Sequence, residues 1–248
     1  MRTQLNGYIV ADEDAWVYRL FGYIVCCPAD IRKAVMENPP GETLTVEINN
    51  NGGNMWAGFE MYSVLRGADC DTEAEIQSLS ASAASIAMLG CKRVKATPVA
   101  QVMVHNPAIT ADGNQYDHRK TAEDLGKFAQ SILNAYELKC RGKRTRAELE
   151  AMMDAETWLP VQEAVEAGLV DEIIGGGSLL PAQVVNCVGG GLRALCGAGG
   201  LPSAAELRAK KAMLDAQNGQ SGGASAEEPE QRSERERLAV SLSVKKYY

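Results

Sequence analysis

Apolar positions along the chain alternate between strand spacing and helical spacing, and this alternation indicates the fold class. Leu44–Ile48 predicts a short strand, Met55–Arg66 places apolar residues at helical spacing, and Thr72–Gln77 predicts the next strand. Further predicted strands are Arg93–Ala96, Val102–Val104 and Val170–Ile174, and further predicted helices are Pro28–Met36, Tyr116–Cys140, Thr145–Met153 and Pro160–Gly168. Strands that alternate with crossover helices indicate an α/β fold built on a parallel sheet.

The N-terminal segment carries a less regular pattern. Tyr8–Val10 and Trp16–Val25 are rich in residues that favour strands, and they predict two early strands around an Asp-Glu-Asp turn. Asn54 precedes the helix that begins at Met55 and is predicted to cap it. The predicted helix Tyr116–Cys140 has one apolar stripe, and a helix of this length extends beyond a small domain. Part of it is therefore predicted to meet another subunit.

Composition divides the chain into three regions. Residues 1–177 carry all of the alternating pattern and are predicted to form one domain. Residues 178–217 are rich in Gly and Ala and end in a predicted amphipathic helix, Ser203–Gln217. Residues 218–248 are dominated by Gly, Ser and Glu, which cannot bury a core, so this tail is predicted to be disordered.

Charge and cysteine usage exclude several classes of function. The net charge of −7 without a basic cluster disfavours nucleic-acid binding, because phosphate neutralisation needs a basic face. The seven cysteines form no CxxC pair and no metal-ligand spacing, which is typical of reduced thiols and predicts neither a metal site nor a cofactor. No apolar run is long enough for a signal peptide or a membrane span. We therefore expect a cytoplasmic protein.

Candidate chemistry gathers around Leu79–Gly90, where small residues and three serines lead from a strand into an apolar helix. Ser85 is the candidate nucleophile in this segment. His105 directly follows a predicted strand and is the candidate base, because a serine hydroxyl needs a base within hydrogen-bonding reach. The backbone N–H groups of Gly53 and Ile86 are the candidate donors to an oxyanion. A serine-lysine dyad with Lys92 is an alternative that the histidine makes unnecessary.

Four motifs resemble the ClpP family of serine peptidases, in the order that the family has them. They are Gly52-Gly53, Ala83-Ala84-Ser85, Met103-Val-His105-Asn-Pro107, and Trp158-Leu followed by Glu163-Ala and Gly168-Leu-Val-Asp171. The resemblance implies a ClpP/crotonase-like fold, with parallel sheet layers, crossover helices and a protruding long handle helix. It also implies a serine-histidine-acid triad and a homo-oligomeric ring, with rings that can stack through Tyr116–Cys140.

The third member of the triad has two candidates. Glu156 holds the position that matches the family's aspartate, and Asp154 lies two residues earlier. Glu156 is favoured because of this match, and Asp154 is the alternative acid. Gly52, Asn54 and Met55 are expected to contact the substrate, because an extended peptide can add a strand beside the loop Asn49–Asn54.

Other traits resemble the ClpP-type prohead proteases of tailed phages and prophages, which are similar to ClpP and act on scaffold and capsid proteins. These traits are Asn50-Asn51 in the glycine loop, a short interval between Ser85 and His105, and the long polar tail. The chain has no P-loop of its own. Two other functions stay open at this point: a non-catalytic structural ring of the same fold, and a crotonase-like acyl-CoA enzyme.

Overall fold

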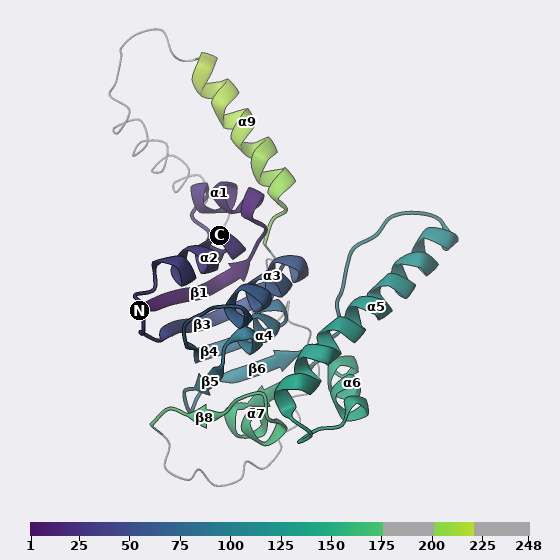
Figure 1. Cartoon of the computed structure of the whole chain (residues 1–248). Helices are drawn as coiled ribbons and strands as arrows, with labels where there is room; N and C mark the ends of the chain where they lie inside the picture. The colour runs from purple at the N-terminus through teal and green to yellow at the C-terminus, as the bar shows by residue number, and fades with distance from the viewer. Residues whose placement is uncertain (176–200, 221–248) are drawn as a thin grey trace. The chain divides into compact units, whose positions relative to one another are not determined.

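The computed structural model describes residues 1–175 and 201–220, with side chains through residue 216. The described residues form two compact units, one from residues 1–11 and 26–175 and the other from residues 12–25 and 201–220. The first unit holds a sheet with helices packed on it (Figure 1). It contains every residue that the sequence predicted to take part in catalysis.

The sheet has the order β2-β1-β3-β4-β5-β8, and β6 pairs with both β4 and β7. Five of the pairings are parallel, among them those of β3 with β1 and with β4, and the pairing of β6 with β7 is antiparallel. The strands are β1 (Arg2–Ile9), β2 (Val25–Cys26), β3 (Leu44–Gly53), β4 (Thr72–Ala81), β5 (Arg93–Ala96), β6 (Gln101–Val104), β7 (Thr157–Pro160) and β8 (Glu172–Ile173). This mostly parallel sheet with crossover helices confirms the predicted fold class.

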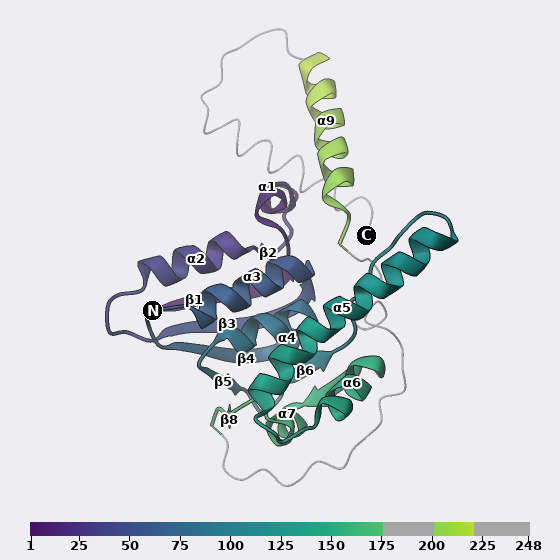
Figure 2. The same ribbon diagram turned by 45° about the vertical axis from the view of Figure 1, so that its right-hand side comes forward.

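The helices of this unit begin and end where local sequence signals predict. Pro28 opens its helix, Asn54 accepts a hydrogen bond from Ala57 N at 3.0 Å, and Thr145 forms a capping box with Glu148. The helices are α2 (Pro28–Glu37), α3 (Met55–Arg66), α4 (Ala83–Ala87) with a 3₁₀ turn at Met88–Gly90, α5 (Gln115–Cys140), α6 (Arg146–Asp154) and α7 (Val161–Ala167). Helices α2, α3 and α4 lie side by side on one face of the sheet (Figures 1 and 2).

The core lies between these helices and the central strands. Alternate residues of β3, namely Leu44, Val46 and Ile48, are fully buried, and Ala74 and Ile76 of β4 are buried beside them. Period-two burial of this kind fixes which face of each strand meets the helices. Because β4 pairs in parallel with both β3 and β6, the carboxyl ends of these three strands lie at the same edge of the sheet.

Helix α5 packs on the sheet unit with its second half only. Ile132, Leu133 and Tyr136 are buried, whereas most residues of the first half are exposed. Lys139 donates to Asp171 at 2.5 Å, and this carboxylate also accepts a hydrogen bond from Val94 N at 2.7 Å. The helix is therefore held at its C-terminal end, while its N-terminal end projects from the sheet (Figures 1 and 2).

In the second unit, the predicted early strand at Trp16–Val25 is wrong, because most of this segment is helical or lies in a turn. Asp12–Leu20 forms helix α1, because three acidic residues in its first turn favour the helix N-terminus. It packs with α9 (Ala204–Gln220), which covers the predicted helix Ser203–Gln217. Tyr18 donates to the carbonyl of Pro202 at 2.9 Å, and Arg208 pairs with Asp14. Residues 176–200 and 221–248, which include most of the predicted disordered tail 218–248, lie outside the described residues. The first three residues of that tail, 218–220, instead belong to α9.

Adding a methyl group at two helical glycines, Gly58 and Gly126, is expected to have opposite effects on the free energy of unfolding. A Cβ at Gly58 in α3 would lie 2.9 Å from the carbonyl oxygen of Ala83, whereas a Cβ at Gly126 in α5 would meet no atom within 4 Å. Gly126→Ala is expected to raise the free energy of unfolding by about 0.5–1 kcal/mol, because Ala favours a helix over Gly. Gly58→Ala is expected to lower it, because α3 and α4 must move apart. Urea denaturation of the two variants checks this, and equal stabilisation by both would contradict the close packing of α3 on α4.

Candidate active site

Ser82 occupies the junction between β4 and α4 in an unusual backbone conformation. Its φ of 55° and ψ of −125° lie in a region that L-residues rarely adopt. Its N–H donates to the carbonyl of Met103 at 3.0 Å, which continues the pairing of β4 with β6. The strand therefore turns abruptly into the helix at this residue, and the side chain of Ser82 projects into a pocket.

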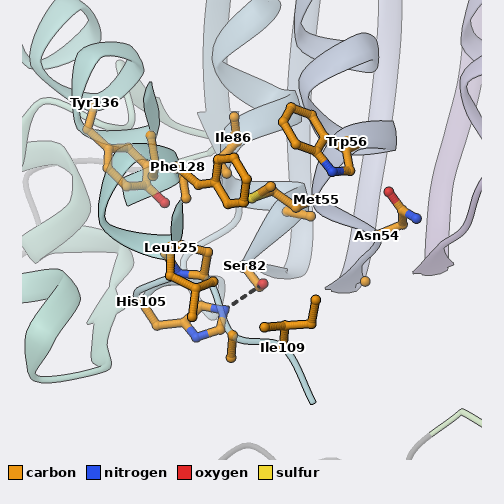
Figure 3. A pocket seen from close by; sticks show the side chains of 15 residues that line it. Asn54, Met55, Trp56, Ser82, Ile86, His105, Ile109, Leu125, Phe128 and Tyr136 are labelled. Atoms are coloured by element: carbon orange, nitrogen blue, oxygen red, sulfur yellow. Dashed lines mark hydrogen bonds between the residues drawn. The ribbon is translucent and has the colours of Figure 1, made fainter. Parts of the chain in front are cut away.

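The hydroxyl of Ser82 lies within hydrogen-bonding distance of the His105 imidazole. Ser82 Oγ and His105 Nε2 are 2.6 Å apart (Figure 3). His105 follows β6, which is the strand that pairs with the end of β4, so the sheet brings the two side chains together. When Nδ1 carries the ring proton, Nε2 can accept the proton of the hydroxyl. This arrangement suits a serine activated by a general base.

The predicted partner of His105, Ser85, does not reach the histidine. Its side chain is 0% exposed, and Ser85 Oγ lies 2.6 Å from the carbonyl oxygen of Ser82 and 2.7 Å from the hydroxyl of Tyr136. Ser85 is three residues into α4, where helical geometry carries its side chain behind the junction instead of into the pocket. The expected pairing of Ser85 with His105 is therefore corrected to one of Ser82 with His105.

The antiparallel pairing of β6 with β7 brings an acid to His105. Val104 is opposite Thr157, so the next step of this register sets His105 opposite Glu156. Burial lowers the pKa of His105, and the negative charge of Glu156 raises it and offsets part of this effect. Asp154, the alternative acid, instead accepts a hydrogen bond from Asn106 Nδ2 at 2.6 Å. Of the two candidates, Glu156 is the carboxylate whose charge acts on the imidazole.

The structure also changes the set of backbone donors near Ser82. Ile86 lines the pocket and follows Ser85 directly, whereas the residue that follows Ser82 directly is Ala83. The N–H of Ala83 lies in the first turn, where no helical carbonyl is available to it. Gly53, the other predicted donor, lines the pocket and has a φ of 141°, a conformation that favours glycine. Ala83 therefore replaces Ile86 as a candidate donor.

The predicted substrate-binding residues are divided between the pocket and its support. Asn54 and Met55 line the pocket, whereas Gly52 packs behind Ser82. A Cβ at Gly52 would lie 2.6 Å from the Cβ of Ser82, so only glycine fits there. The Gly52 N–H donates to Asn50 Oδ1 at 2.7 Å, which holds the glycine loop against the junction.

The pocket has a volume of about 350 Å³, and much of its wall comes from residues that sequence reasoning missed. Apolar and aromatic side chains of α3 and α5 surround the Ser82 hydroxyl (Figure 3). The missed residues are Ser82, Ala83, Pro107, Ala108, Ile109, Leu125, Phe128, Ile132 and Tyr136. The apolar stripe of α5 was the available signal for several of these residues. Part of it was assigned to contact with another subunit because the helix is long, whereas Leu125, Phe128, Ile132 and Tyr136 line the pocket.

Other candidate chemistry is not assembled at this site. Lys92 donates to Asp71 at 2.9 Å and does not line the pocket, so the serine-lysine alternative has no geometric support. Within residues 1–175 and 201–220, no group of His, Cys, Asp and Glu side chains is arranged to hold a metal ion. None of the helices in the described part of the chain is long and apolar enough to cross a membrane.

Comparison with known proteins identifies the family. The family model described as Clp protease matches residues 34–176, which is more than half of the chain and includes both Ser82 and His105. The chain therefore belongs to the Clp protease family. The family is consistent with the mostly parallel α/β architecture and with the ClpP/crotonase-like fold.

Individual relatives are ATP-dependent Clp protease proteolytic subunits. The protein from Bacteroides fragilis strain ATCC 25285 is 28% identical over 137 residues, which are 54% of this chain and 65% of the relative. Subunit 1 from Protochlamydia amoebophila is 30% identical over 139 residues, which are 54% of this chain and 66% of the relative. Subunit 1 from Chlamydia trachomatis serovar D is also 30% identical over 139 residues, with 71% of the relative covered. The chain thus spans about two thirds of the length of these relatives.

Two acid substitutions are expected to separate the roles of Glu156 and Asp154 at His105. Glu156→Gln should lower the pKa of His105 further, because it removes the negative charge that favours the imidazolium. Asp154→Asn should leave this pKa unchanged, because Asp154 bonds to Asn106. Titration of the His105 ring by NMR measures both effects. An unchanged pKa in Glu156→Gln, or an equal shift in Asp154→Asn, would show that the carboxylate near His105 is misassigned.

Proposed function

We propose that the protein is a serine endopeptidase in which Ser82 is the nucleophile, His105 the general base and Glu156 the acid that orients the base. The observation that carries this proposal is the 2.6 Å contact between Ser82 Oγ and His105 Nε2 at the wall of a pocket. The lowered pKa of His105 supports it, because the imidazole is then neutral and able to accept a proton at neutral pH.

The proposed reaction proceeds through an acyl-enzyme. Ser82 Oγ attacks the carbonyl carbon of a peptide bond as its proton passes to His105 Nε2, and the carbonyl oxygen gains the negative charge. The N–H groups of Ala83 and Gly53 are the proposed donors to this oxygen. Collapse of the intermediate breaks the C–N bond, and His105 returns the proton to the leaving amine. Water, deprotonated by His105, then hydrolyses the ester and restores Ser82.

The walls of the pocket indicate the kind of side chain that such a substrate presents. Met55, Phe128 and Ile132 line the pocket together with Ser82, and none of the lining residues in the described part of the chain is Asp, Glu, Lys or Arg. Burial of apolar surface favours an apolar residue of the substrate there. Proteins and peptides are therefore the proposed substrates, with cleavage next to an apolar residue.

The family context supports two further parts of the proposal. The relatives are named as proteolytic subunits of a Clp protease, and we propose that this chain likewise works in the cytoplasm as a homo-oligomeric ring, with stacking of rings through the projecting half of α5. The tail from residue 178 onward and Asn50-Asn51 in the glycine loop support a role as a prophage head maturation protease that acts on scaffold or capsid proteins. The short interval between Ser85 and His105 was one of the traits that favoured this role. The interval from the proposed nucleophile Ser82 to His105 is longer, at 23 residues, so this trait now supports the role less than the other two do.

The two other functions have less support. A non-catalytic ring would not need a serine hydroxyl hydrogen-bonded to a histidine nitrogen, whereas Ser82 Oγ and His105 Nε2 lie within hydrogen-bonding distance of each other. An acyl-CoA enzyme would need basic groups for the adenosine phosphates, and among residues 1–175 and 201–216 no Lys or Arg lines the pocket. No specific observation therefore favours either function.

A fluorophosphonate probe tests the assignment of the nucleophile. The full chain is expected to react with the probe, and peptide mapping of the adduct should locate it on Ser82. Ser82→Ala should abolish labelling, because no other hydroxyl among the described residues is within hydrogen-bonding distance of His105 Nε2. Ser80→Ala is the matched control: Ser80 is also buried, two residues upstream, and its hydroxyl has no hydrogen-bond partner in the described part of the chain. Full labelling of Ser82→Ala would refute the proposal.

The proposed ring makes a separate prediction about mass. Native mass spectrometry of the full chain should give a cyclic multiple of 26.6 kDa. Replacing exposed Tyr116 on α5 with Asp should reduce stacking of rings without changing the mass of the single ring, because this side chain is exposed in one chain. A monomer at micromolar concentration would contradict the ring and leave the assignment of Ser82 untouched.

A further inference from the structure

A chain of three hydrogen-bonding groups lies directly behind Ser82. Ser85 Oγ is 2.6 Å from the carbonyl oxygen of Ser82 and 2.7 Å from the hydroxyl of Tyr136. A carbonyl oxygen only accepts, so Ser85 must donate its single proton to Ser82. Tyr136 must then donate to Ser85. The direction of both hydrogen bonds is thus fixed by the chemistry of the three groups.

The Ser82 carbonyl belongs to the same peptide unit as the N–H of Ala83. A trans peptide is planar, and its C=O and N–H point in opposite directions. A hydrogen bond that holds the carbonyl toward Ser85 and Tyr136 therefore holds the Ala83 N–H in the opposite direction. The Ala83 N–H is the group that the proposed function assigns to the oxyanion.

We propose that Ser85 on helix α4 and Tyr136 on helix α5 are positioning residues that set the orientation of the Ser82–Ala83 peptide, and with it the Ala83 N–H donor. The proposal rests on the proposed function, because it concerns the oxyanion donor of that reaction. It gives Ser85 a role that differs from the nucleophile that the sequence predicted. Neither residue touches the scissile bond.

The conformation of Ser82 shows why such support is needed. Its φ of 55° is sparsely populated, and a residue in such a region costs on the order of 1–3 kcal/mol and persists only when its surroundings hold it. The Ser82 carbonyl is held on one side by Ser85 N at 2.9 Å and by Ser85 Oγ. Without the hydroxyl, the peptide keeps only the backbone bond and can rotate toward commoner conformations.

The burial of the pair supports a defined role for it. Ser85 is fully buried and Tyr136 is 1% exposed, so water cannot replace either partner when the other is removed. Burial also raises the pKa of Tyr136, so its hydroxyl stays protonated and able to donate across the working pH range. Tyr136 lies on the half of α5 that packs on the sheet, where its ring is anchored among core residues.

The kinetics of fluorophosphonate labelling test this inference. Saturation kinetics with the full chain separate the binding constant of the probe, KI, from the rate of phosphonylation, kinact. Tyr136→Phe should lower kinact about tenfold and Ser85→Ala up to about a hundredfold, because loss of a whole oxyanion donor costs roughly 10²–10³. KI should stay within about twofold in both, because each substitution removes one oxygen that is hydrogen-bonded inside the protein and leaves the apolar wall of the pocket in place.

A double variant tests whether the two residues act as one unit. Tyr136 contacts the Ser82 carbonyl only through Ser85, so the double variant should be no slower than Ser85→Ala alone. Tyr116→Phe on the exposed half of α5 and Ser80→Ala on β4 are the matched controls, and both should label at the wild-type rate. A purely structural role would instead give additive losses or a change in KI.

The outcomes separate this inference from the function on which it rests. Wild-type kinact in Ser85→Ala and Tyr136→Phe, with labelling that still depends on Ser82, would overturn the positioning role alone. Absence of Ser82-dependent labelling in the wild type would overturn the proposed function and the inference with it. Tyr136→Phe removes one oxygen and adds no atom, so it keeps the test decisive even where Ser85→Ala unfolds.

Discussion

The abrupt turn at Ser82 is the constraint on which the site depends. A hydroxyl at the end of a buried strand can face a pocket only when the backbone leaves the strand at once, and Ser82 does so with a positive φ. Hydrogen bonds on both sides of the residue hold this conformation. Met103 accepts from the N–H of Ser82, and Ser85 donates to its carbonyl. Sheet pairing and helix packing thus together maintain a conformation that the residue would not adopt alone.

The sheet assembles the site from distant parts of the chain. Strand β6 pairs with β4 in parallel and with β7 in an antiparallel register, so one strand brings His105 to Ser82 and Glu156 to His105. The glycine loop after β3 completes the arrangement, because Gly52 packs so closely on Ser82 that a side chain would not fit. The strand ends therefore set the distances between the candidate groups.

Helix α5 connects the pocket with the support behind it. Leu125 and Phe128 form part of the pocket wall, and Tyr136, further along the same helix, bonds to Ser85. Its last turn is anchored by the Lys139 pair with Asp171. The helix that projects from the sheet thus also contributes to the candidate site.

Much of the fold follows from the sequence alone, because its signals are local. Helical spacing predicted α3 with its observed bounds, and Asn54 and Thr145 marked helix starts that the structure confirms. His105 was found because a polar residue at the carboxyl end of a predicted strand lies at the edge where parallel sheets place ligands. The segment Asp12–Leu20 was misread, since its aromatic residues favour strands while its acidic first turn favours a helix.

The sequence by itself therefore determined the α/β class, the histidine and the Leu79–Gly90 junction between strand and helix. It did not determine which serine of that junction faces the histidine, because Ser80, Ser82 and Ser85 differ little in local pattern. That choice depends on the point at which the chain leaves β4 and on the direction of α4, and both are set by pairing with β6 and packing against α5. Tertiary structure alone decided that Ser82 faces the pocket and that Ser85 lies behind it.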